Sequence, residues 1–252
     1  MDSETGRARA FLFGTVLALG DSLTFGARSP GGLGYPELLG PMMTEHSERS
    51  GHEESRVEWV AVNRGISKET TREILDRTPA AMSVIASSAG LKWCVILAGT
   101  NDSKADGTRL VDWEKLYRQI VHWPRRYKIP VALCTFPPIR PGQAGEFTAK
   151  SRIWLEQASA RVRAMVAELD GCPSPVRLVD LERTITEEDL IDGVHLRGGG
   201  YAKMARAICD VLTDEQRTPT PTGDPLPPEP GDVPRGRARR KATRVTPSTE
   251  VP

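Results

Sequence analysis

Thr15-Val16-Leu17-Ala18-Leu19-Gly20-Asp21-Ser22-Leu23 is the stretch that decides the fold of this 252-residue chain. Its first five residues form a short apolar run between Gly14 and Gly20, which is typical of a buried strand in a parallel sheet. Ser22 follows at the carboxyl end of that strand, where open α/β sheets place their ligands. Because a serine after a strand is often only a helix cap, its role depends on the residues downstream.

Strand-like and helix-like patterns alternate from this run to about residue 213. Further strands are expected at 57–62, 93–98, 129–136 and 176–181. Helices are expected at 36–47, 108–122, 153–169 and 201–212, with another that is capped by Ser67 and interrupted near Pro79. The alternation predicts parallel strands joined by right-handed crossovers. The expected fold is an α/β protein, a three-layer α/β/α sandwich around a five-stranded parallel sheet, formed by residues 1–213.

The segment 214–252 differs from the rest in composition. It is rich in proline and almost free of large apolar residues, so it is expected to be a disordered tail. Its basic cluster, 235–241, is read as a solvated segment, with contact to an acidic partner as the alternative. Without this tail the chain carries 27 basic and 27 acidic residues, which argues against a nucleic-acid-binding domain.

The sequence also bears on location and metal binding. No run of 18 apolar residues occurs, so no membrane-spanning helix is expected. The apolar segment 10–19 resembles the core of a signal peptide, but cleavage after it would remove the first strand. The four cysteines lack metal-type spacing and fit a reducing compartment, which predicts a cytoplasmic protein. His46, His52 and His122 have no ligand partners at metal spacing, so neither a metal nor a cofactor is expected.

Five residues in short motifs, each just past a strand or just before the final helix, together suit acyl transfer. Such a reaction needs a nucleophile, a base, a group that orients the base, and donors for the oxyanion. Ser22 is the candidate nucleophile, His195 the general base and Asp192 the carboxylate that orients the imidazole. The candidate oxyanion donors are the N–H groups of Ser22 and Gly65 and the side-chain amide of Asn101.

These motifs resemble the SGNH subgroup of the GDSL family of serine esterases and lipases. The four family letters match Ser22, Gly65, Asn101 and His195 in order, and the family's acid matches Asp192. The resemblance spans residue 14 to about 210 and implies a flavodoxin-like sheet with strand order 2-1-3-4-5. It also implies metal-free hydrolysis of carboxylic esters and thioesters, from short acyl esters and lysophospholipids to O-acetyl groups on sugars.

The expected function is a serine esterase that forms an acyl-enzyme on Ser22 and acts on a small ester, with short to medium acyl chains or a lysophospholipid-like form. A carbohydrate O-deacetylase or an acyltransferase would use the same residues, and a non-catalytic binding module is the alternative from another class. Arg64, Lys104 and Arg140 are expected to be surface charges; two of them facing the cleft would favour an anionic substrate. Asp21 and Asp102 are expected to cap a turn or a helix.

Overall fold

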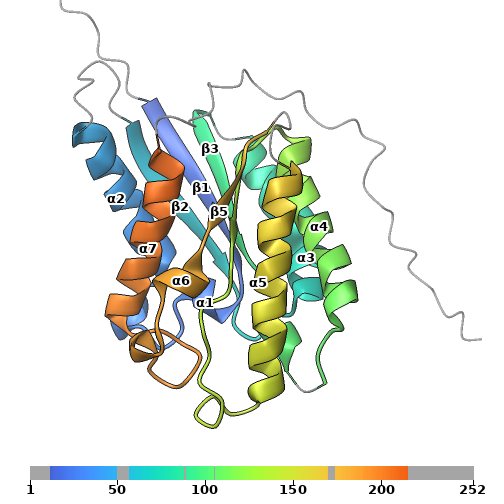
Figure 1. Ribbon diagram of the computed structural model, residues 1–252. Helices are drawn as coiled ribbons and strands as arrows, with labels where there is room; N and C mark the ends of the chain where they lie inside the picture. Colours follow the sequence, from blue (N-terminus) through green and yellow to red (C-terminus); the bar gives the residue numbers. More distant parts are fainter. Residues whose placement is uncertain (1–11, 50–56, 88, 105, 170–173, 215–252) are drawn as a thin grey trace, which may run out of the picture.

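The computed structural model describes residues 12–49, 57–87, 89–104, 106–169 and 174–214, and the predicted tail falls almost wholly outside them. The described chain forms one five-stranded sheet in which every strand pair is parallel, in the order β2-β1-β3-β4-β5 (Figure 1). This confirms the predicted fold class and strand order. The strands are β1 (Leu12–Gly20), β2 (Val57–Gly65), β3 (Leu91–Leu97), β4 (Val131–Cys134) and β5 (Val176–Val179).

Helices cover both faces of this sheet. Helices α2 and α7 lie side by side on one face, and α3, α4 and α5 cover the other (Figure 1). The long helices are α2 (Tyr35–Arg49), α3 (Thr71–Ala86), α4 (Leu110–Arg126), α5 (Ala149–Leu169) and α7 (Gly198–Thr213). The short ones are α1 (Ser22–Phe25) and α6 (Leu181–Thr184), with single 3₁₀ turns η1 (Pro30–Gly32), η2 (Asn101–Ser103) and η3 (Glu187–Asp189).

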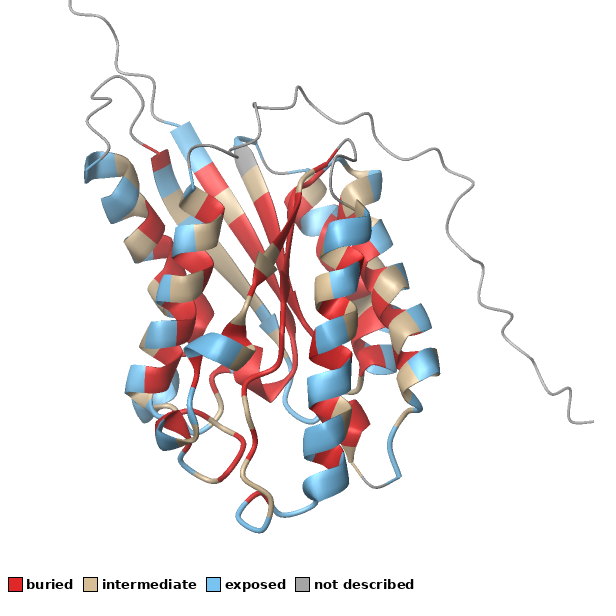
Figure 2. Cartoon of the chain, viewed as in Figure 1, coloured by how far each residue is buried: buried red, intermediate tan, exposed pale blue. Residues whose placement is uncertain are grey.

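The core lies along the central strands. Val16 to Leu19 in β1 and Cys94 to Leu97 in β3 are all at most 1 % exposed, as expected for strands covered on both faces (Figure 2). Each fully buried aliphatic side chain of this kind contributes about 1.5–3 kcal/mol to stability. The amphipathic pattern of α4 places Trp113, Tyr117 and Ile120 in the same core.

The start of α3 differs from the prediction. Ser67 does not cap the helix; the N-cap is Thr70, which forms a capping box with Glu73. Lys68 explains why the helix starts later than predicted, because its φ of 72° lies in the left-handed region and cannot belong to a right-handed helix.

Within the described segments, no helix is both long and apolar enough to cross a membrane.

The predicted interruption of α3 at Pro79 is also wrong, since the helix continues to Ala86. A proline inside a helix costs about 3 kcal/mol. Ile74, Met82 and Ile85, which lie on either side of it, are nearly inaccessible to solvent. Their burial, at about 1.5–3 kcal/mol each, outweighs the proline's cost.

Candidate active site

The candidate residues gather at one edge of the sheet because all five strands are parallel. Gly20 at the end of β1 pairs in register with Gly65 at the end of β2 and with Leu97 near the end of β3. The polar segments that follow these strands therefore meet at the carboxyl edge. Helix α1 begins at this edge, directly after β1 (Figure 1).

Ser22 is the first residue of α1. The Asp21 side chain caps this short helix by accepting a hydrogen bond of 3.0 Å from the N–H of Leu23, and Gly26 ends it in the left-handed conformation. As the first helical residue, Ser22 finds no acceptor for its own N–H within the helix. The turn thus presents the Ser22 hydroxyl and N–H together, with only 7 % of the residue exposed.

Asp21 is fully buried beside the candidate nucleophile. Loss of hydration raises its pKa to about 6, although the hydrogen bond from the N–H of Leu23 lowers it in part. The predicted capping role of Asp21 is confirmed by its bond to Leu23. Asp102 also caps a helix, but a distant one, because its Oδ2 accepts from the N–H and hydroxyl of Thr71 at the start of α3.

His195 and Asp192 form a compact turn between β5 and α7. One Asp192 oxygen accepts hydrogen bonds from the N–H groups of Val194 and His195, at 3.2 and 2.8 Å. The other oxygen lies 2.8 Å from His195 Nδ1, and His195 Nε2 lies 3.0 Å from Ser22 Oγ. Partial burial alone would raise the pKa of Asp192, but the hydrogen bonds from His195 and Val194 hold it below its ordinary value. An ionised Asp192 can therefore orient the imidazole toward the serine.

Asn101 belongs to η2, just past β3. Its amide nitrogen donates a 2.9 Å hydrogen bond to the carbonyl of Glu69, in the turn between β2 and α3. A primary amide carries two hydrogens, so one remains to bind another acceptor. The indole N–H of Trp113 donates to the carbonyl of Ala98 and fixes the chain three residues before Asn101.

The N–H of Gly65, one of the predicted oxyanion donors, has a hydrogen-bond partner in the structure. It donates to the side-chain oxygen of Asn63 at 2.9 Å, so it is already bonded within its own turn. A Cβ at this position would lie 2.1 Å from the backbone nitrogen of Phe25, so glycine is needed for close packing of β2 against α1. Of the three predicted oxyanion donors, the Ser22 N–H has no acceptor within its helix, and the Asn101 amide keeps one hydrogen beyond its bond to Glu69.

The cations named from the sequence have different surroundings. Arg64 is exposed, Lys104 pairs with Glu146 at 2.7 Å, and Arg140 is held by hydrogen bonds to Glu187 in η3. The sequence offered no signal for Arg28. Its guanidinium lies 3.5 Å from the carboxylate of Asp192 in the candidate triad.

Arg77 is a second residue that local sequence patterns did not reveal. It lies inside α3, yet it donates hydrogen bonds to the carbonyl of Gly20 and to the Glu69 carboxylate. Gly20 lies two positions before Ser22 in the chain, and Glu69 accepts a hydrogen bond from Asn101. No motif or spacing could have found this contact, because it joins segments 57 residues apart.

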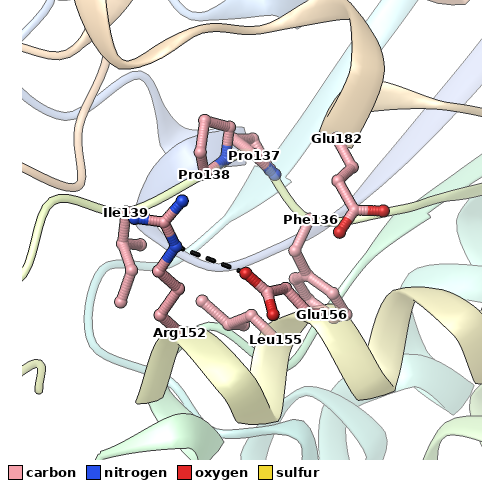
Figure 3. A pocket seen from close by; sticks show the side chains of 8 residues that line it. All are labelled: Phe136, Pro137, Pro138, Ile139, Arg152, Leu155, Glu156 and Glu182. Carbon is pink, nitrogen blue, oxygen red and sulfur yellow. Dashed lines mark hydrogen bonds and ion pairs between the residues drawn. The ribbon is translucent and has the colours of Figure 1, made fainter. Parts of the chain in front are cut away.

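A pocket of about 160 Å³ lies between the loop after β4 and helix α5 (Figure 3). The loop after β4 forms one wall with Pro137 and Pro138, and α5 forms another with Leu155 and the ion pair between Arg152 and Glu156. Ser22, Asn101, Asp192 and His195 do not line it. The pocket therefore belongs to the β4 and α5 side of the fold.

The chain is similar to known proteins in sequence and in fold. The model of the GDSL-like Lipase/Acylhydrolase family matches residues 18–203. The chain belongs to this family, and it is a carboxylic ester hydrolase. A search of the curated proteins finds no match.

Several solved structures share the fold. One is Est24, a carbohydrate acetylesterase from Sinorhizobium meliloti, with a TM-score of 0.62 and 20% identity over 78% of this chain and 96% of that one. Another is the M. smegmatis aryl esterase, with a TM-score of 0.60 and 19% identity over 78% and 96%. The lipase/acylhydrolase from Enterococcus faecalis gives 0.57 and 20% over 77% and 93%. At such identities the likeness concerns the fold.

Proposed function

We propose that this protein is a serine esterase that cleaves small carboxylic esters through an acyl-enzyme on Ser22. The observation that carries the proposal is the hydrogen-bonded row from Ser22 Oγ to His195 Nε2, at 3.0 Å, and from His195 Nδ1 to Asp192, at 2.8 Å. These distances are within the range in which a base takes a proton from a nucleophile.

In the proposed reaction His195 takes the proton of Ser22 as the hydroxyl oxygen attacks the ester carbonyl. Asp192 holds the imidazole in place and stabilises the imidazolium that forms. The Ser22 N–H and the free hydrogen of the Asn101 amide stabilise the oxyanion of the tetrahedral intermediate. His195 then gives the proton to the leaving alcohol, and water hydrolyses the acyl-enzyme by the same steps.

The test is hydrolysis of p-nitrophenyl esters from acetate to palmitate by the wild type and by Ser22→Ala. We expect a preference for short to medium acyl chains and a loss of roughly 10⁴-fold or more in kcat for the variant. Ser83→Ala, on the exposed face of α3, is the matched control and should keep full activity. Undiminished turnover in Ser22→Ala, or a fluorophosphonate adduct on another residue, would contradict the mechanism.

The ester itself is the open part of the proposal. A carbohydrate O-deacetylase is the main alternative, since a structural neighbour is a carbohydrate acetylesterase. An acetylated sugar offered as the substrate distinguishes a deacetylase from a general esterase. An acceptor alcohol added to the same assay detects acyl transfer. Much faster turnover of the acetylated sugar than of p-nitrophenyl acetate would favour the deacetylase.

We further propose that residues 1–213 are the hydrolase domain. The family match over 18–203 and the end of α7 at Thr213 support this boundary. A cytoplasmic location is supported by the burial of Cys94, Cys134 and Cys209 as free thiols. Contact of the basic cluster at 235–241 with an acidic partner stays a prediction.

A further inference from the structure

Arg77 connects the end of β1, which leads to Ser22, with the turn at Glu69, which contacts Asn101. Its Nη2 donates to the carbonyl of Gly20 at 3.0 Å, and its Nε donates to a carboxylate oxygen of Glu69 at 2.7 Å. Only 20% of the Arg77 side chain and 15% of the Glu69 side chain are exposed. The pair is therefore less screened by solvent and salt than an ordinary surface ion pair.

Each contact ends close to a group of the site. Gly20 is the last residue of β1, two positions before Ser22, and its carbonyl also accepts from the N–H of Ile66 at 3.2 Å. Glu69 uses its own carbonyl to accept the hydrogen bond from the Asn101 amide, at 2.9 Å. One guanidinium thus holds both the strand that leads to the nucleophile and the turn that orients Asn101.

Arginine suits this task better than lysine. Its planar fork has several donors in fixed directions, so it can bind a carbonyl and a carboxylate at once. The turn that contains Glu69 is also fixed two residues later, where Thr71 donates hydrogen bonds to Asp102. Without Arg77, the turn around Glu69 would keep that anchor and the bond from Ile66 to Gly20, but the Glu69 carboxylate would lose its connection to the Gly20 carbonyl.

We propose that Arg77 is a positioning residue that sets the orientation of the Asn101 amide, through Glu69, relative to Ser22. The inference rests on the proposed function. Arg77 itself touches none of the reacting atoms. Because a misplacement of about 1 Å can cost up to 10²-fold in rate, loss of Arg77 should lower kcat more than it changes KM.

The test is a double-mutant cycle that combines Arg77→Gln with Asn101→Ala, measured with p-nitrophenyl acetate. In the wild-type background Arg77→Gln should lower kcat at least about tenfold and change KM less than about twofold. In the Asn101→Ala background the same change should cost less than about threefold, because the group that Arg77 orients is already absent. An equal loss in both backgrounds, or a loss confined to KM, would overturn the proposal.

Arg118→Gln is the matched control. Arg118 lies on α4 and, like Arg77, forms hydrogen bonds to a glutamate side chain. Its partners are Glu114 on α4 and Glu168 on α5, and it contacts none of the candidate site residues. This variant should have the same kcat and KM as the wild type. Should Arg77→Gln not fold, Arg77→Lys, which keeps the charge and loses the fork, enters the same cycle with the same criteria.

The side-chain amide of Asn101 gives a readout that does not depend on activity. Its ¹H–¹⁵N signals should shift in Arg77→Gln and stay in place in Arg118→Gln. Unmoved signals in Arg77→Gln would refute the positioning role even if every ester tested is hydrolysed. Shifted signals together with no ester hydrolysis by the wild type would instead refute the proposed function and leave the contact intact.

Discussion

Replacing the buried carboxylate of Asp21 by an amide should stabilise the fold at neutral pH and hardly change it in acid. Burial raises the pKa of Asp21 from 3.8 to about 6 in the folded protein. Between these values the folded state holds a proton that the unfolded chain has released, so stability falls as pH rises through this window. Above pH 6 the full cost of burying the ionised carboxylate is present. It is about 3 kcal/mol, at 1.36 kcal/mol per unit of difference between the two pKa values.

Asp21→Asn removes the charge and retains the cap, because the amide oxygen can still accept from the N–H of Leu23. The assay is urea unfolding at pH 4, 6 and 8, with the free energy of unfolding extrapolated to water. The gain over wild type should be near zero at pH 4 and grow to about 3 kcal/mol at pH 8.

Asp76→Asn serves as the control, since Asp76 is exposed on α3 and its change should leave stability within about 0.5 kcal/mol at every pH. A gain for Asp21→Asn that is constant with pH, or that grows toward acid, would refute the assignment of a buried, costly charge at Asp21. A loss at all three pH values would show that the carboxylate itself is needed to cap α1.

Three further changes test the surroundings of the site. Trp113→Phe leaves the buried carbonyl of Ala98 without its donor and should lower the free energy of unfolding by about 1–3 kcal/mol in a urea titration; an unchanged midpoint would mean that this bond is not important. Lys68→Gly relieves a left-handed residue and should raise stability by about 1 kcal/mol, whereas a lower melting temperature would indicate that the lysine side chain holds the turn. Removal of residues 215–252 should leave both the melting temperature and the turnover of small esters unchanged, and a large fall in either would assign the tail a part in the fold or the site.

Every predicted strand and helix is present in the predicted order, whereas the short helices α1 and α6 were not predicted. The strands β1 and β3 were recognisable because burial on both faces requires continuous apolar runs. The observed ends of the elements differ from the predicted ends by a few residues where local patterns compete with packing. The helix expected at 108–122 extends to Arg126, and α3 passes through Pro79. In α3 the burial of side chains on both sides outweighs the local cost of the proline.

The sequence by itself determined the parallel sheet and the residue types at its carboxyl edge, because strand periodicity and the motifs around Ser22, Asn101 and His195 are local in the chain. Only the tertiary structure decided which side chains hold the segments around these residues. It brought Arg77 in α3 to the Gly20 carbonyl and the Glu69 carboxylate. Such contacts depend on where whole elements pack against one another, and a contact between distant segments leaves no period or spacing in the sequence.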